Sequence, residues 1–138
     1  MKILRLLLIA LLPLLPACDD GGASGNGGAL DGTAWRLDGW SASSLDPAGF
    51  TITADFSDGV VGGTSAVNHY SGPFTAKGGV FFAGPLAVTE MAGPEPAMRA
   101  EQIYLNLLGA ARKYDLTAEN LLLRDAGGNE LLRFAPQK

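Results

Sequence analysis

Hydrophobic and polar residues alternate along much of the chain, and this alternation predicts short β-strands. The clearest case is FTITADF at residues 50–56, where every second residue from Phe50 to Phe56 is apolar and threonine or aspartate fills the positions between. A period of two with β-branched residues is typical of a half-buried strand. Comparable runs predict further strands at 33–38, 60–63, 69–75, 80–83, 86–89, 113–116, 120–124 and 130–134.

The pattern changes once, after Pro94, to the spacing of an amphipathic helix. Residues 94–114 have an apolar stripe at intervals of three and four, formed by Ala100, Ile103, Tyr104, Leu107, Leu108 and Ala111. Pro96 suits a first turn, and Glu95 and Glu101 lie toward the positive end of the helix dipole. Arg112 and Lys113 lie toward its negative end.

These elements predict an α+β domain. Turn sequences at 57–59 (SDG) and at Gly78-Gly79 separate the strands, which favours an antiparallel β pseudo-barrel or curved sheet. We expect the single helix to pack on that sheet and cover an open end or face. Phe81 and Phe82 are adjacent in a strand, so their side chains point to opposite faces and one of them is expected to be exposed or covered by the helix.

The N-terminus indicates secretion. Residues 1–17 combine Lys2 and Arg5, an apolar run over 3–15 and a small residue at Ala17, which is the pattern of a signal peptide. The end of this segment, LPAC at 15–18, resembles the bacterial lipobox, and that resemblance implies cleavage before Cys18 and its diacylation. The alternative is ordinary cleavage near Ala17, which leaves a free thiol.

Three consecutive regions follow from this: a signal peptide at 1–17, a lipidated Cys18 with a flexible tether at 18–29, and a folded domain at 30–136. The expected location is the cell envelope, with the domain facing the periplasm. Asp19 directly after the cysteine resembles an inner-membrane retention signal, although the choice of membrane stays open. Cys18 is the only cysteine, so no disulfide can form within the chain.

Charge narrows the range of partners. Without residues 1–17 the chain carries 8 basic and 14 acidic residues, a net charge of −6. An acidic domain with no basic cluster argues against nucleic acid and against electrostatic docking on anionic lipid. We expect a monomer that meets the membrane through its N-terminus, with an envelope protein or a small apolar ligand as partner.

Candidate catalytic chemistry centres on His69, the only histidine, with Ser65 and Ser71 nearby. A catalytic triad needs the base within hydrogen-bond reach of its partners, and no G-x-S-x-G motif is present. One histidine and one cysteine make a zinc or copper site improbable, and no calcium-binding spacing occurs, so neither a metal nor another cofactor is expected. Asn68, Gly63 and Gly72 instead suit a tight corner, where Asn68 tolerates left-handed backbone or bonds nearby main chain.

The domain resembles the META-domain (HslJ-like) family in four pieces that occur in the family's order. They are GTAWRL at 32–37, VGGTSAVNHYSG at 61–72, TEMAG at 89–93 and LLLRDAGGNELLRF at 121–134. The matching motif residues are Gly32, Thr33, Trp35, Gly63, Asn68, Tyr70, Gly72, Thr89 and Met91, all with an expected structural role. His69 falls on a variable position of the N-x-Y motif. The resemblance implies a pseudo-barrel fold, an envelope location and an association with stress, but no reaction.

The chain departs from the family pattern at two cysteines. Val67 replaces one, after Ala66 in place of a glycine, and Gly93 replaces the other. Where both cysteines are present they could pair as a disulfide, and the missing crosslink would withdraw about 3 kcal/mol.

Three hypotheses remain. The first is a lipid-anchored, non-catalytic envelope module with a stress-related binding or interaction role. The second is a pilotin-like carrier that holds a hydrophobic ligand between sheet and helix. The third is a small hydrolase that uses His69.

Overall fold

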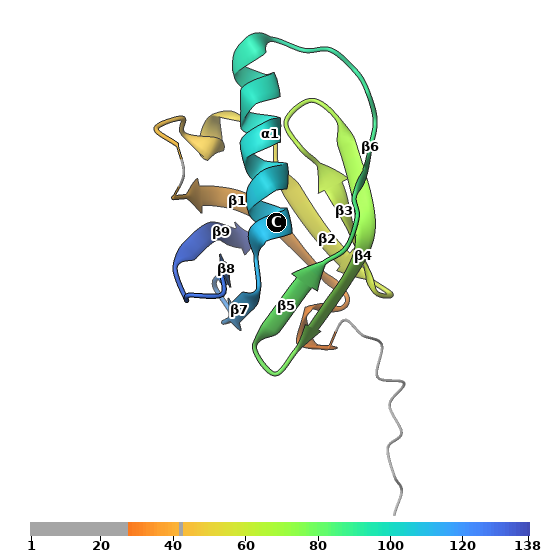
Figure 1. Cartoon of the computed structure of the whole chain (residues 1–138), viewed down its shortest axis with the longest axis vertical. Coiled ribbons are helices and arrows are strands. Elements are labelled where there is room, and N and C mark those ends of the chain that lie inside the picture. Colours follow the sequence, from red (N-terminus) through yellow and green to blue (C-terminus); the bar gives the residue numbers. More distant parts are fainter. Residues whose placement is uncertain (1–27, 42) are drawn as a thin grey trace, which may run out of the picture.

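The computed structural model describes residues 28–41 and 43–138. The expectations for residues 1–17, for Cys18 and for most of the tether lie outside the described residues. Within the described part there are nine strands, one α-helix and two short 3₁₀ segments (Figure 1). The elements before the helix are η1 (Gly28–Leu30), β1 (Thr33–Trp40), η2 (Pro47–Gly49), β2 (Thr53–Ser57), β3 (Val60–Thr64), β4 (His69–Lys77), β5 (Val80–Ala83) and β6 (Ala87–Val88). The helix α1 (Glu95–Ala110) is followed by β7 (Lys113–Leu116), β8 (Leu121–Arg124) and β9 (Glu130–Pro136).

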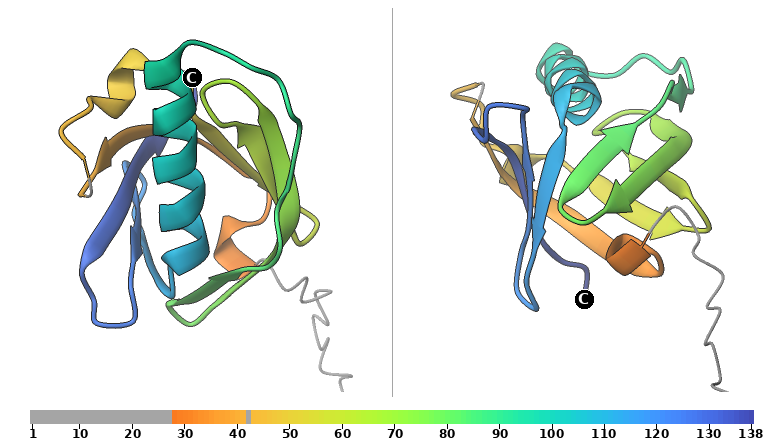
Figure 2. Two further views of the ribbon diagram at one scale, coloured as in Figure 1. Left: turned by 45° about the horizontal axis from the view of Figure 1, so that its top comes forward. Right: turned by 60° about the horizontal axis from the view of Figure 1, so that its bottom comes forward.

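The strands form one strongly curved antiparallel sheet, as the sequence pattern predicts. Their order is β3-β2-β1-β9-β8-β7-β5-β4-β6, and a further pairing between β3 and β4 brings the sheet round into a ring. Figure 2 shows α1 lying against this ring. The predicted α+β pseudo-barrel with one packed helix is therefore confirmed.

Two predicted turns close hairpins of the ring. Asp58 and Gly59 have φ angles of 52° and 76°, and Gly78 and Gly79 have φ angles of 58° and 81°. Positive φ at both central residues matches the right-handed twist of the flanking strands, which is why glycine and aspartate occupy such turns. The sequence signals at 57–59 and 78–79 therefore mark the β2–β3 and β4–β5 turns correctly.

The core fills the space between the ring and the helix. Its largest fully buried side chains are Tyr104, Phe56, Phe74, Phe81, Phe134, Leu30, Leu37, Ile52, Leu108, Leu121, Leu123 and Leu132. The rings of Tyr104 and Phe134 lie edge to face with centroids 6.3 Å apart, so the helix packs directly on an aromatic side chain of β9. As expected, Phe81 is buried and Phe82 is exposed.

The helix begins where predicted and ends earlier. Pro94 lies at the N-cap and Glu95 in the first turn, but Ala111 is extended, so Lys113 starts β7 instead of continuing the helix. Arg112 nevertheless interacts with the helix end, since its guanidinium donates to the carbonyls of Gly109 and Ala111. Ile103 and Leu107 of the predicted apolar stripe are only half-buried.

Two predicted strands differ in extent. β2 begins at Thr53, and Ile52 before it makes an isolated bridge to Ser65. β6 has two residues where four were expected, because only Ala87 and Val88 pair with β4. The whole segment between β5 and α1, residues 84–94, includes β6 and runs beside the ring. We call this segment the strap.

Candidate functional site

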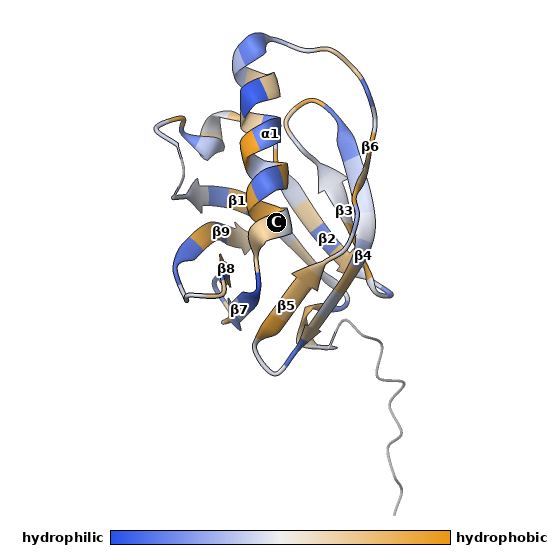
Figure 3. Cartoon of the chain, viewed as in Figure 1, coloured by the Kyte–Doolittle hydropathy of each residue, from blue (hydrophilic) through white to orange (hydrophobic). Residues whose placement is uncertain are grey.

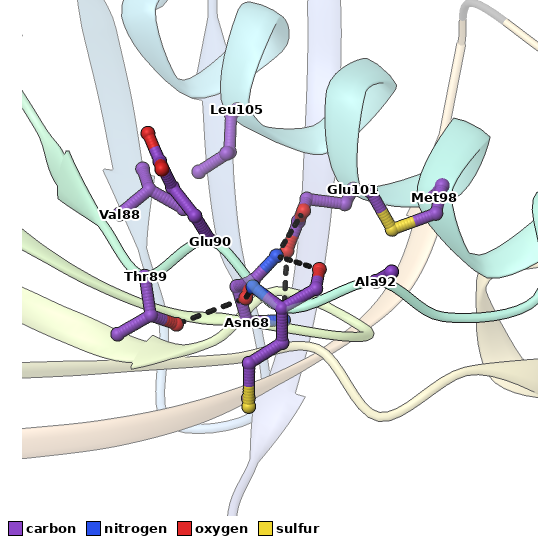
Figure 4. A pocket seen from close by; sticks show the side chains of 9 residues that line it. Asn68, Val88, Thr89, Glu90, Ala92, Met98, Glu101 and Leu105 are labelled. Carbon is purple, nitrogen blue, oxygen red and sulfur yellow. Dashed lines mark hydrogen bonds between the residues drawn. The ribbon is translucent and has the colours of Figure 1, made fainter.

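Asn68 joins three parts of the chain at the corner between β3 and β4. Its side-chain oxygen accepts hydrogen bonds from the backbone N–H of Met91 (2.6 Å) and the hydroxyl of Thr89 (3.0 Å). Its side-chain nitrogen donates to the carbonyl of Met91 (3.2 Å) and to Oε2 of Glu101 (2.8 Å). The amide therefore pairs with the strap as a neighbouring strand would, and it also contacts α1 (Figure 4).

Glu101 completes this arrangement from the helix. Its Oε1 accepts from the Ser65 hydroxyl (2.6 Å) and from the backbone N–H of Asn68 (2.8 Å). The side chain is buried, with 6% of the residue exposed. We call Ser65, Asn68, Thr89, Met91 and Glu101 the corner network.

The corner network keeps Glu101 ionised. Burial raises the pKa of its carboxyl, but hydrogen bonds from Ser65, from the side chain and backbone of Asn68 and from the backbone of Val67 lower it, and the net effect is a pKa below the ordinary value. A carboxylate whose oxygens already accept these hydrogen bonds is a poor proton acceptor for a substrate. Its arrangement is that of a structural anchor.

Two tyrosines, one from β4 and one from α1, are in contact inside the barrel. The Tyr70 and Tyr104 hydroxyls are 2.5 Å apart, and the Tyr70 hydroxyl also bonds the Thr53 carbonyl at 2.7 Å. Burial raises the pKa of both phenols well above the ordinary value, and their mutual hydrogen bond lowers that of Tyr70 and raises that of Tyr104. The pair is neutral and links β4 to α1.

A groove lies over the corner network, between α1 and the strap. It has a volume of about 440 Å³ and is lined by Asn68, Val88, Thr89, Glu90, Met91, Ala92, Met98, Glu101 and Leu105. Met91 is half exposed at its rim. The groove thus offers flexible apolar side chains around a polar floor.

His69 does not line the groove. It is the first residue of β4 and its side chain is exposed. It lines a second depression of about 400 Å³, together with Tyr70, Ser71, Ala87, Val88 and Thr89. The Ser65 hydroxyl bonds Glu101 and the Asn68 carbonyl, so it is not directed to His69.

The remaining motif residues have structural roles elsewhere. Gly32 has a φ of 80°, and Thr33 accepts from the Trp35 indole at 2.8 Å while donating to the carbonyl of Leu30. A Cβ on Gly63 would lie 2.4 Å from the Thr53 carbonyl oxygen, and one on Gly72 would lie 2.6 Å from that of Pro85. The motif therefore marks a turn before β1, the corner network, and two close backbone approaches at Gly63 and Gly72.

Asn68 suits a corner in two ways, by tolerating left-handed backbone and by bonding nearby main chain, and the structure uses the second. The residue with positive φ is Ala66, at 78°, where the family pattern has glycine. Asn68 acts through its side chain. The expectation that it bonds nearby main chain was correct, because it bonds both backbone groups of Met91.

The two departures from the cysteine pattern are in contact. A Cβ built on Gly93 would lie 2.8 Å from Cγ2 and 3.5 Å from Cβ of Val67. Since the Cβ atoms of a disulfide are about 3.5–4.5 Å apart, cysteines at these two positions would be within bonding range. Here Val67 occupies the space that a side chain at 93 would need.

Sequence reasoning missed Glu101. It was assigned to the helix dipole, but it is one of four buried residues of α1, with Ala100, Tyr104 and Leu108. The available signal was its spacing, three residues before Tyr104 and seven before Leu108, which places a carboxylate on the buried stripe. Buried carboxylates need partners, and Ser65 and Asn68 supply them.

Within 28–41 and 43–138, no group of three or more histidine, cysteine, aspartate or glutamate side chains is placed to hold a metal ion. In the same residues, α1 does not have the length and apolar character of a membrane-crossing helix.

Comparisons with known proteins agree with the fold. An NMR structure of a protein from Burkholderia xenovorans is 28% identical, with a TM-score of 0.67, and the match covers 79% of this chain and 84% of that one. A second NMR structure, 20% identical, has a TM-score of 0.60 over 77% of this chain and 90% of that one. A crystal structure of a DUF4847 family protein from Bacteroides vulgatus shares the fold at 16% identity, with a TM-score of 0.58 over 80% and 97%.

A comparison with curated proteins found no match. The family model for the META domain matches residues 28–138, which include the strands, the helix, the corner network and both walls of the groove. The chain belongs to the META-domain family.

Proposed function

We propose that this META-domain protein is a lipid-anchored, non-catalytic module of the bacterial envelope that binds a partner through the groove between α1 and the strap. The observation that carries the proposal is the saturation of the corner network. Its carboxylate, amide and hydroxyls bond one another, and in the described residues no buried side-chain polar atom lacks a partner. The network fixes a surface and leaves no reactive group poised over it.

The groove supplies the binding surface. Val88, Met91, Met98 and Leu105 give it apolar walls, and Glu90 adds an exposed acidic group. Methionines adapt to the shape of a partner because their side chains are unbranched and polarizable. The corner network holds both walls at a fixed spacing, which lowers the ordering cost of binding.

Anchoring is supported by the LPAC sequence and by the position of Cys18 before the domain. Mass spectrometry of the N-terminal peptide is expected to show a diacylated Cys18. A Cys18→Ser chain should be recovered with the soluble envelope proteins. Wild-type chain that carries an unmodified thiol at Cys18 would contradict the anchor.

A photo-crosslinking residue at position 91 tests the groove. We expect a discrete adduct in envelope fractions, stronger after heat shock if the stress association holds. Position 60 is the matched control, because Val60 is 45% exposed and Met91 is 50% exposed, but Val60 lies on β3 away from the groove. Equal labelling at both positions, or enzymatic turnover abolished by Glu101→Gln or His69→Ala, would overturn the proposal.

A carrier function for a small apolar ligand is the second candidate. The space between helix and ring holds packed aromatic rings, so the groove beside the helix, with its volume of about 440 Å³, is the better location. Native mass spectrometry with a medium-chain fatty acid tests it. Binding that Leu105→Trp removes, with the fold intact, would support a carrier, and a ligand-free spectrum for both chains would end this candidate.

A further inference from the structure

Five exposed residues of β5 and its neighbours form one surface, which we call the basic–apolar patch: Lys77, Val80, Phe82, Arg112 and Lys113. Val80 pairs with Lys77 on one side and with Lys113 on the other, so these three side chains lie in one row across β4, β5 and β7. Val80 and Phe82 are 63% and 48% exposed, and residues two apart on a strand share a face. The Arg112 guanidinium lies over the Phe82 ring, 5.3 Å from its centroid.

The patch concentrates positive charge in an acidic domain. Ion pairs in the described residues are Arg99–Glu95, Arg124–Asp115 and Arg133–Asp38, and none involves a cation of the patch. Lys113 pairs with Arg124 on β8, and Arg124 is in turn bonded to Asp115 and paired with Glu130. The sequence shows no basic cluster because Lys77 is far along the chain from Arg112 and Lys113; strand pairing gathers them.

The patch also lies near the point where the N-terminal segment joins the domain. Gly28 packs so closely on β4 that a Cβ there would be 2.5 Å from the carbonyl oxygen of Ala76, the residue before Lys77. Figure 1 shows η1 and the β4–β5 hairpin at one end of the molecule, while the segment from β6 to α1 rises to the other end. In Figure 3 the hydrophobic β5 adjoins a strongly hydrophilic stretch at the start of β7.

We propose that the basic–apolar patch docks the domain on the anionic phospholipid surface of the membrane to which the chain is anchored. This inference rests on the anchor of the proposed function, which brings the β4–β5 end to the bilayer. Lysine and arginine attract anionic headgroups, while Val80 and Phe82 enter the interfacial region. The domain's net negative charge acts weakly at a distance, because the screening length is about 8 Å at physiological ionic strength. Docking in this orientation leaves the groove facing away from the membrane.

A fluorophore beside the patch tests the docking. Thr75 is exposed and pairs with Phe82, so Thr75→Cys introduces a labelling site that preserves all five patch residues. The full chain, processed in cells, is labelled there with an environment-sensitive dye and reconstituted with vesicles of phosphatidylcholine, with or without phosphatidylglycerol. We expect a blue shift only with phosphatidylglycerol, lost when salt rises from about 0.1 M to about 1 M, where screening shortens from about 10 Å to about 3 Å.

Charge variants make the test specific. Lys113→Gln should weaken the docked state about fivefold, the effect of one cation near an anionic surface. Arg36→Gln is the matched control, because Arg36 is exposed on β1 and makes the same change in net charge away from the patch. A dye at Ser44→Cys, in the exposed loop between β1 and η2, should report no change.

The outcomes separate the two proposals. Chain that sediments with both kinds of vesicle while the dye at position 75 stays silent overturns the patch and leaves the anchor intact. Chain that sediments with neither, and whose Cys18 reacts with the dye, overturns both. An equal blue shift with both vesicles, or one produced by poly-glutamate without vesicles, would also overturn anionic lipid as the occupant.

Discussion

At the corner between β3 and β4, the residue that needs left-handed backbone is not the glycine that the family pattern has there. Ala66 has a φ of 78°, a region in which a Cβ crowds the following carbonyl at a cost of about 1–2 kcal/mol. Glycine occupies this place in the family pattern, and it has no such cost. The motif could be recognised from the sequence, but the residue with left-handed backbone could not, because asparagine tolerates positive φ better than alanine and local preference favours Asn68.

Ala66→Gly is therefore expected to stabilise the domain. Relief of the left-handed strain exceeds the extra entropy that glycine gives the unfolded chain, and a net gain of about 1 kcal/mol is expected. Chemical denaturation of the two chains measures the free energy of unfolding. Ala48→Gly, in an exposed 3₁₀ turn without positive φ, is the control and should not stabilise. A loss of stability in Ala66→Gly would contradict the assigned conformation.

Val67 and Gly93 form the second instructive pair of residues. The sequence shows both cysteines of the family missing together, and the structure shows why the replacements are matched: Val67 fills the space beside a glycine that has no Cβ. A cysteine at either position alone breaks this match.

The double variant Val67→Cys/Gly93→Cys, in a Cys18→Ser chain, is expected to form a disulfide. Crosslinking a loop of this length stabilises by about 3 kcal/mol on the chain-entropy model. Gly93→Ala is the steric control and should destabilise, because its Cβ would meet Val67 at 2.8 Å. Denaturation with and without reductant, and a thiol count, measure both effects. Free thiols in the oxidised double variant would show that the two positions are farther apart than described.

At the scale of elements, the sequence pattern located the helix correctly but did not identify all of its buried residues. The change of period at Pro94 located α1, since three- and four-residue spacing is distinctive. Its predicted buried stripe was incomplete because Glu101 was related only to the helix dipole. Only the partners of Glu101, Ser65 and Asn68, make its burial favourable, and they lie 36 and 33 positions away in the sequence.

Glu101→Gln should reduce stability at neutral pH by about 2 kcal/mol, because an amide replaces a carboxylate that accepts hydrogen bonds from Ser65 and Asn68. The folded-state pKa of Glu101 lies below the ordinary value, so its contribution is complete above the unfolded pKa of about 4.3. It is lost as pH falls through the folded pKa. The stability difference between wild type and variant should therefore narrow below about pH 4.

Denaturation curves across that pH range check this prediction. Glu95→Gln is the matched control, since Glu95 is exposed on the same helix and pairs only with Arg99. Its effect should be within about 0.5 kcal/mol at every pH. A Glu101→Gln difference that stays constant down to acid pH would mean that the carboxylate's charge has no part in holding α1.

At the scale of the whole molecule, hydrogen bonds join neighbouring strands all the way round the ring, and the sparsest pairing is the seam between β5 and β7. β5 and β7 share one register pair, Val80 with Lys113, and β6 pairs only with β4. The sequence predicted the strands and their antiparallel arrangement, because alternation and turns are local. It could not predict this seam, because closing the ring depends on which strands, far apart in the sequence, pair at their edges. The corner network lies elsewhere and joins the β3–β4 corner to the strap and to α1.

Asn68→Ala should loosen the strap locally before the ring unfolds. The substitution removes the side-chain bonds of residue 68 to Thr89, Met91 and Glu101, while β6 keeps its pairing with β4, so the strap is weakened after β6. Hydrogen exchange should then show fast exchange at the Met91 amide. The amides of β1 and β9, which pair along most of their length, should still exchange only through global unfolding. His69→Ala is the control, because the His69 backbone contacts the strap while its side chain is outside the corner network. Uniform loss of protection in Asn68→Ala would mean that strap, helix and ring unfold as one unit, and the groove would then be as rigid as the core instead of a separately held surface.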